Sequence, residues 1–271
     1  MKRKFVNFKS PREFMEEALK ARAYDTPGGI WPHSNWTMDK MELIRALLDR
    51  IGGRFSVSLE INVDQGESHE VFKWFLASIL YGARISETIA NNTCREFERS
   101  GVLSPDRILE TGWDGLVQIL DAGGYVRYDF KTATKLLEVV AALKERFDGD
   151  LNVLHARAQS PHDLEQKLME LGRGIGPTTA NIFLRELRDV WDKADPLPQD
   201  LAVMAARNLR LVQADERREI LSELRSVWEG QALPAWDFAD FESSLVRLGK
   251  DYCRREKCAT CPVAEECERS A

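Results

Sequence analysis

The chain has 271 residues, of which 44% are hydrophobic and 30% are charged, a balance that excludes a disordered or fibrous protein. Its 38 Lys and Arg residues against 44 Asp and Glu residues leave a formal net charge of −6, which excludes a globally basic, histone-like binder but not a local basic strip. No stretch reaches the ~20 apolar residues of a membrane-spanning helix, and no apolar signal segment follows the basic start, so we expect neither a membrane protein nor a secreted one.

Helical periodicity dominates the sequence. It predicts helices over 11–21, 38–51, 69–82, 85–99, 105–110, 113–121, 127–147, 161–171, 177–192, 200–209, 215–228 and 237–252. The one clear alternation of apolar and polar residues, at 55–63, predicts a strand or an extended linker. The Pro/Asp-rich stretch 192–200 predicts a connector between two helical bodies. We therefore expect a mainly α fold with at most a small β element near the N-terminus.

A glycine-rich segment joins two of these predicted helices. Gly174 and Gly176 permit backbone angles that other residues avoid, Ile175 between them can plug the space between the helices, and Pro177 suits a first helical position. We interpret the segment as a helix-hairpin-helix, in which the turn and the next helix N-terminus bind a DNA phosphate without reading base sequence. The alternative is a tight turn whose glycines serve steric needs alone.

Four of the five cysteines lie in the last 19 residues with the pattern C-x4-C-x2-C-x5-C. They are Cys253, Cys258, Cys261 and Cys267. Disulfide frameworks belong to short secreted chains, so these thiols indicate a metal site instead. One close pair flanked by single cysteines favours an iron–sulfur cluster, with zinc as the alternative. The fifth, Cys94, lies in an amphipathic helical stretch and is expected to be an inert core thiol.

The hairpin, an aspartate some twenty residues later and the C-terminal cysteines together resemble the endonuclease III superfamily of DNA glycosylases. The resemblance covers about residues 67–271, where 72–84, 125–137 and 199–207 are similar to successive helical segments of that family. It implies two helical domains with a DNA-binding cleft between them. A bundle of residues 67–190 would end in the helix-hairpin-helix, and a discontinuous domain of residues 1–66 and 191–271 would hold a 4Fe-4S cluster.

The resemblance also assigns catalytic roles. Asp200 matches the catalytic aspartate, which stabilises the sugar cation as the glycosidic bond breaks. The alternatives are a helix N-cap at Asp200 and the rival carboxylate Asp195. Thr178 stands where bifunctional members carry the lysine that forms a Schiff base, so no lyase step can pass through this residue, and Lys193 is the nearest other amine. Thr178 either hydrogen-bonds a phosphate or an attacking water, or only satisfies the first turn of its helix.

Several cations are expected to face DNA. Arg254, Arg255 and Lys257 lie between two of the clustered cysteines, where a metal-anchored loop would hold them against phosphates, although a solvated charge run is the alternative. Arg84, at the expected mouth of the cleft, would fill the gap left by an extruded base, and Arg173 would add a phosphate contact. The base pocket would draw on aromatic and polar side chains, with these candidates: Trp31, His33, Trp36, Tyr81, Tyr125 and Tyr128.

The sequence thus predicts a monofunctional DNA glycosylase of base excision repair. It would act as a monomer on double-stranded DNA with a damaged or mismatched base, in the cytoplasm of a prokaryote or in the nucleus or an organelle of a eukaryote. One alternative is a non-catalytic DNA-binding protein that recognises a lesion or a structure. The other is an abasic-site lyase that uses a different lysine.

Overall fold

The computed structural model describes residues 34–231 and 233–267, with side chains from residue 40 on. The predicted helix at 11–21 lies outside the described residues, as do Trp31, His33 and the side chain of Trp36. From Met41 on, the described residues form one compact unit. The division predicted at 67–190 against 1–66 and 191–271 therefore stays a prediction.

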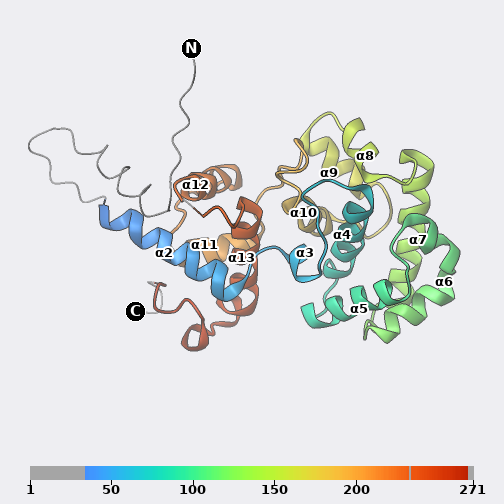
Figure 1. Ribbon diagram of the computed structural model, residues 1–271, viewed down its shortest axis with the longest axis horizontal. Helices are drawn as coiled ribbons and strands as arrows, with labels where there is room; N and C mark the ends of the chain where they lie inside the picture. Colours follow the sequence, from blue (N-terminus) through green and yellow to red (C-terminus); the bar gives the residue numbers. More distant parts are fainter. Residues whose placement is uncertain (1–33, 232, 268–271) are drawn as a thin grey trace, which may run out of the picture. The chain divides into compact units, whose positions relative to one another are not determined.

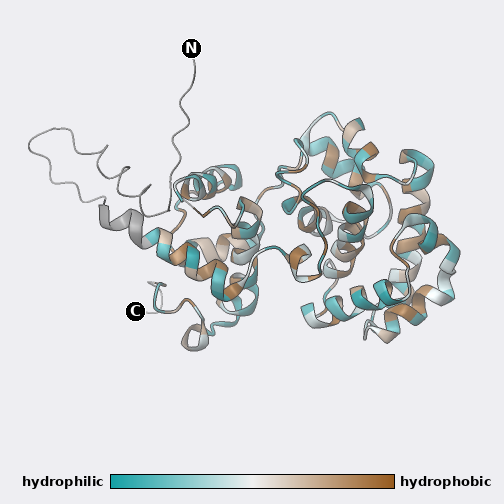
Figure 2. Cartoon of the chain, viewed as in Figure 1, coloured by the Kyte–Doolittle hydropathy of each residue, from teal (hydrophilic) through white to brown (hydrophobic). Residues whose placement is uncertain are grey.

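Helices make up most of the described chain, in the order labelled in Figure 1. They are α2 (Ser34–Ile51), α3 (Phe55–Ser58), α4 (Ser68–Tyr81), α5 (Glu87–Arg99), α6 (Pro105–Ala122), α7 (Asp129–Phe147), α8 (Leu151–Arg157), α9 (Pro161–Met169), α10 (Pro177–Arg185), α11 (Asp200–Asn208), α12 (Arg217–Glu229) and α13 (Phe238–Asp251), followed by the 3-10 turns η1 (Cys253–Arg255) and η2 (Cys258–Thr260). No strand occurs among the described residues, which confirms the mainly α class. Brown and teal segments alternate along these helices in Figure 2, as expected for amphipathic helices that bury one face. No helix within the described ranges is long and apolar enough to cross a membrane.

The alternating segment 55–63 is not a strand. It begins with the short helix α3, whose first two backbone N–H groups, of Phe55 and Ser56, donate to the Glu186 carboxylate at 2.8 and 2.9 Å. Phe55, Ile61 and Val63 are buried, whereas Val57 is exposed. The alternation therefore reflects an irregular segment that buries some of its apolar residues against helices, because residues 34–231 and 233–267 offer no second strand for pairing.

The predicted break between helices 105–110 and 113–121 is confirmed: they meet in α6 at a kink, where Gly112 has a non-helical φ of 66°. Other elements differ from the prediction. Helix α8 was not predicted, because its seven residues are too short for a clear period. Helix α10 ends at Arg185, and the apolar residues Leu187 and Trp191 are buried from turns that follow it.

Helix α4 is a largely buried helix. It contacts α5, α8 and α10, and its residues from Leu76 to Leu80 are almost fully buried. Trp74, fully buried, donates its indole N–H to the carbonyl of Phe183 on α10 at 3.0 Å. This packing places the C-terminal end of α4 beside the first turn of α10, since a Cβ atom at Gly82 would lie 2.2 Å from the Thr179 hydroxyl.

Helix α13 is the common packing partner of the C-terminal elements, because it contacts α10, α11, α12 and η1. Helices α11 and α13 cross so closely at Gly249 that a Cβ atom there would lie 2.1 Å from the carbonyl oxygen of Leu201. Any larger residue at this position would push the two backbones apart. The crossing thus fixes the start of α11, where Asp200 lies, against α13.

Candidate nucleic-acid interface

The turn between α9 and α10 has the predicted hairpin geometry at its centre. Gly174 has a φ of +90°, a conformation that side-chain-bearing residues rarely adopt, and Ile175 is buried between the helices with only 4% of its surface exposed. Pro177 is the first residue of α10. The expectation for Gly176 is wrong in one respect, because its φ of −108° is open to any residue. A Cβ atom at Gly176 would nevertheless meet open space, so this backbone is accessible to a ligand.

A lysine that sequence reasoning missed lies against the same turn. A Cβ atom at Gly174 would lie 2.8 Å from Cε of Lys135 and 3.3 Å from its Nζ, so the lysine stem from α7 packs on the glycine. Burial lowers the pKa of Lys135, and no carboxylate within the described part of the chain pairs with it. Arg173 and Thr178 are exposed on either side of the turn. The hairpin therefore presents two cations, Lys135 and Arg173.

Asp200 is the first residue of α11 and is highly exposed, with 89% of its side-chain surface accessible. It does not cap its helix: the N-cap residue is Gln199, which makes no capping bond with its side chain. The Asp200 carboxylate instead accepts a hydrogen bond from Arg217, which also donates to the Pro198 carbonyl at 2.6 Å. The Gln199 amide donates to the Thr178 carbonyl at 3.5 Å, so the start of α11 lies beside the first turn of α10.

The rival carboxylate, Asp195, is held in the structure by arginines. Arg188 pairs with it at 3.2 Å and Arg225 at 2.7 Å, and Arg218 binds it as well. Arg188 also pairs with the fully buried Glu242 at 2.8 Å. These ion pairs account for Asp195 as a structural residue. Lys193 is accounted for in the same way, because it pairs with Asp192 at 3.1 Å.

A cavity of about 640 Å³ lies beside the hairpin, and we call it the hairpin cavity. It is lined by residues of α3, the end of α4 and the α4–α5 connection, α10, the start of α11, the end of α13 and η1. Thr178 and Arg84, both predicted site residues, line it, as do Gln199 and Leu201 on either side of Asp200. Asp200 itself is not a lining residue. The structure therefore brings Arg84 and Thr178 to one cavity, together with the two neighbours of Asp200, whereas Arg173, Gly174 and Gly176 do not line it.

A second cavity of about 530 Å³ adjoins the first and extends to η1; we call it the loop cavity. The two share Ile85, Glu87, Lys250 and Arg254. Together they are lined by seven cationic side chains and two carboxylates: Arg50, Arg84, Arg185, Arg247, Lys250, Arg254 and Arg255 against Glu87 and Asp251. This is a local formal charge of +5 in a chain whose net charge is −6. Of the three predicted loop cations, Arg254 and Arg255 line these cavities, whereas Lys257 is exposed and lines neither.

Glu87 is the one acidic side chain that lines both cavities, and the sequence did not single it out. Its carboxylate accepts from Arg247 at 2.6 Å and from Lys250. Burial opposes its ionisation, but the charges of Arg247 and Lys250 prevail and lower the pKa of Glu87. Glu87 is therefore ionised and offsets one positive charge, and the cations of the lining remain in excess. No local pattern indicated this cluster, because α5 and α13 are about 160 residues apart.

The predicted aromatic candidates divide between cavity and core. Tyr81 lines the hairpin cavity, and its ring meets that of Phe55, a lining residue that the sequence did not indicate, at 5.5 Å. Tyr125 is 99% buried and donates its hydroxyl to the Leu80 carbonyl at 3.0 Å, so it is a core residue. Tyr128 packs against Tyr125.

All four C-terminal cysteines line a single cavity of about 280 Å³. The wall is completed by side chains of α11 and α13, Asn208 and Leu248, together with Tyr252, Glu256 and Val263. None of the four thiols forms a disulfide. Burial, together with the neighbouring thiols, raises the pKa of Cys261. No three His, Cys, Asp or Glu side chains of the described residues converge closely enough to hold one metal ion. The choice between an iron–sulfur cluster and zinc therefore stays a prediction.

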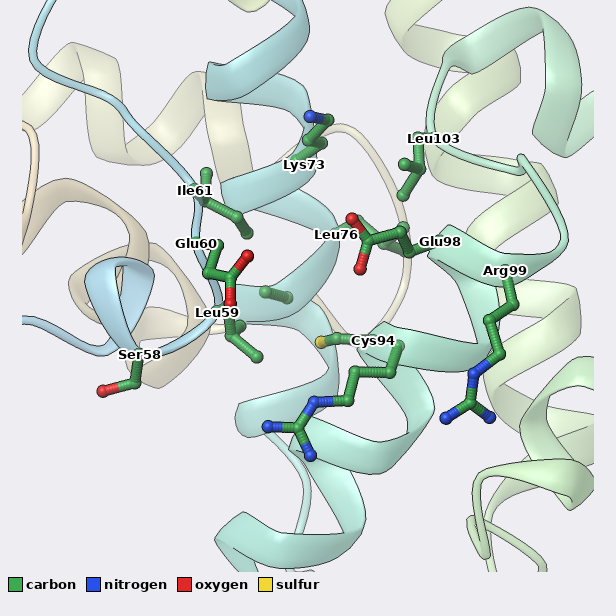
Figure 3. Close-up of a pocket in the computed structure, with 12 residues that line it drawn as sticks. Ser58, Leu59, Glu60, Ile61, Lys73, Leu76, Cys94, Glu98, Arg99 and Leu103 are labelled. Carbon is green, nitrogen blue, oxygen red and sulfur yellow. The ribbon is translucent and has the colours of Figure 1, made fainter.

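Cys94 has the properties expected of an inert thiol. It lines a separate pocket of about 230 Å³ between α4 and α5, and Figure 3 shows its sulfur directed from α5 toward α4. Burial raises the pKa of Cys94 to about 12, so the reactive thiolate is scarce at neutral pH.

A search with models of known protein families finds none that matches this chain. No curated protein matches its sequence either.

Proposed function

We propose that this protein is a monofunctional DNA glycosylase that hydrolyses the N-glycosidic bond of a base extruded from double-stranded DNA. The observation that supports this most strongly is the pair of adjoining cavities with a local charge of +5 beside a hairpin turn. A cationic groove in an otherwise acidic protein attracts a polyanion, and a cavity of this size accepts a base.

The hairpin would anchor one strand. Gly174 is exposed and a Cβ atom at Gly176 would meet open space, so a phosphate could approach the first N–H groups of α10, where Lys135 and Arg173 add charge. These contacts position DNA without selecting a sequence. Arg84 is exposed on the α4–α5 connection at the cavity wall, and it would occupy the space that the extruded base leaves in the duplex.

Asp200 would act at the sugar. Its neighbours line the cavity, so a base held inside places its sugar near the rim where the carboxylate lies. As the glycosidic bond breaks, positive charge develops on the sugar, and a carboxylate stabilises that charge and positions the attacking water. Arg217 holds the Asp200 side chain in the resting protein and must yield part of this contact when the sugar binds.

The cysteine cavity fits a 4Fe-4S cluster by its donor set, since four thiols line one space. When bound, the cluster would tie the last described residues into one rigid unit. This would hold Arg254 and Arg255, from the turn that begins at Cys253, at the wall of the loop cavity.

One observation keeps a lyase as the second candidate. Lys250 lines both cavities, in contrast to Lys193, which lines neither. However, Lys250 pairs with Glu87 and with Asp251, and a paired ammonium lacks the free electron pair that a Schiff base requires. We therefore expect no covalent adduct with abasic DNA on borohydride treatment, and a trapped adduct lost in Lys250→Gln would favour the lyase.

The experiment that tests the proposed function is excision from a lesion panel. Duplexes carrying uracil, hypoxanthine, oxidised, alkylated or mismatched bases are incubated with the full-length holoprotein, and alkaline cleavage reveals abasic sites. We expect an abasic product from at least one lesion and no strand cleavage without alkali. Tight binding to a lesion duplex without any product would favour the non-catalytic DNA-binding protein instead.

A further inference from the structure

We propose that the hairpin cavity accepts a neutral, carbonyl-bearing base and rejects bases that carry a positive charge. This inference rests on the proposed function and adds the class of substrate base. It comes from the charges around the cavity and from one buried cation in its wall.

Arg185, the last residue of α10, lines the cavity although its side chain is only 1% exposed. Its Nε donates to the Ser243 hydroxyl at 3.2 Å. Its Nη2 lies 3.8 Å from the Glu186 carboxylate, beyond hydrogen-bond distance. Its Nη1 is buried and has no hydrogen-bond partner among the described residues. A buried guanidinium N–H without a hydrogen-bond acceptor lowers the stability of the protein, and an acceptor that binds there removes this cost.

The nearest carboxylate cannot easily serve as that acceptor. Glu186 uses one oxygen for the Phe55 N–H and the other for the Ser56 N–H, at 2.8 and 2.9 Å, and so fixes the start of α3. A carbonyl oxygen of a bound base would be a suitable partner for Nη1, because this donor has already lost its water. The resulting bond would be charge-assisted, the stronger kind of hydrogen bond.

The other charged residues of the hairpin cavity also favour a neutral base over a cationic one. Besides Arg185, its lining includes Arg84, Lys250 and Arg254, and the one carboxylate, Glu87, is already paired with two cations. The walls are therefore positive, and a cationic base would be repelled inside a partly water-excluded space. Bases alkylated on a ring nitrogen, such as 7-methylguanine, carry such a charge, whereas hypoxanthine and uracil are neutral and bear carbonyl oxygens.

Binding of base analogues tests this inference without a folding risk. Three duplexes carry hypoxanthine, purine or 7-methylguanine on a 2′-fluoro sugar, which slows cleavage, each opposite an abasic analogue so that base pairing contributes nothing. Purine differs from hypoxanthine by the missing carbonyl. With the wild-type holoprotein we expect purine and 7-methylguanine to bind about 10- to 100-fold more weakly than hypoxanthine.

A matched pair of variants assigns the effect to Arg185. Arg185→Lys keeps the charge but removes Nη1, and we expect it to reduce the preference for hypoxanthine over purine to less than threefold. Arg188→Lys changes a neighbouring buried arginine that does not line the cavity, and we expect the preference to persist. Circular dichroism establishes that each variant is folded.

The possible results separate this inference from the proposed function. Equal binding of hypoxanthine and purine by the wild-type protein would overturn the inference and would indicate that Nη1 turns to the unpaired buried oxygen of Glu242. Tight binding or rapid excision of 7-methylguanine would overturn it as well, while the glycosylase proposal would stand. Absence of both excision and lesion-specific binding across the panel would remove the proposed function and this inference with it.

Discussion

Single residues at the hairpin show what a sequence can and cannot indicate. Gly174 and Ile175 were predicted because their roles, a left-handed backbone and a buried plug, depend on adjacent positions. Lys135 was not predicted, because it reaches the turn from α7, some forty residues earlier, and no local pattern connects the two. The same holds for Arg185, whose unused donor is visible only once its buried neighbours are known.

Lys135 provides a prediction at this scale. Lys135→Gln should weaken binding to any duplex about 3- to 10-fold and lower the salt dependence by about one unit of log–log slope, because one phosphate contact is lost. Fluorescence anisotropy between 50 and 200 mM salt measures both. Lys131→Gln, on the exposed surface of the same helix one turn earlier, is the control and should change the affinity less than twofold. Equal effects of the two substitutions would mean that Lys135 contributes only general charge.

At the scale of elements, helices were predictable where a full apolar stripe exists and were missed where it does not. Helices α4 to α7 and α11 to α13 have this stripe, and their predicted bounds differ little from those observed. Of the two interpretations of 55–63, a strand or an extended linker, the strand was wrong, because alternating apolar residues can be buried by separate helices as well as by a sheet. The buried Glu186 then provides acceptors for the backbone N–H groups at the start of α3.

The crossing of α11 and α13 provides a prediction for elements. Gly249→Ala places a methyl group 2.1 Å from the Leu201 carbonyl, so the helices must separate, and we expect the free energy of unfolding to fall by about 1–3 kcal/mol. Since α11 begins at Asp200, any excision activity should fall as well. Gly230→Ala is the control: its Cβ would lie 3.6 Å from the nearest atom, and it should leave the stability unchanged or slightly higher. Urea unfolding compares the two, and equal stabilities would show that the crossing tolerates expansion.

At the scale of the whole molecule, the cysteine spacing and the order of motifs indicated how distant parts combine. In the structure the four C-terminal thiols line one space, and Thr178, Arg84 and the two neighbours of Asp200 line another. The basic surface that joins these sites was only partly predictable. Arg254 and Arg255 were visible as a charge run, whereas Arg50, Arg247 and Lys250 join them through folding.

The metal provides a prediction for the whole molecule. We expect protein purified without oxygen to absorb near 400 nm, since zinc is colourless and an iron–sulfur cluster is not. Cys258→Ser should abolish this absorbance and weaken duplex binding, because the turn with Arg254 and Arg255 would lose its anchor. Cys94→Ser should retain the absorbance. A colourless wild-type protein with one bound zinc would contradict the cluster.

The central claim is that a base held in the hairpin cavity is excised at Asp200. Single-turnover excision of the preferred lesion by Asp200→Asn tests it most directly, with Asp215→Asn as the control, since Asp215 is also exposed and paired with an arginine but lies away from the cavity. We predict that Asp200→Asn excises at least about 100-fold more slowly while its Kd for the lesion duplex changes less than threefold, and that Asp215→Asn matches the wild type. Excision at the wild-type rate by Asp200→Asn would contradict the account.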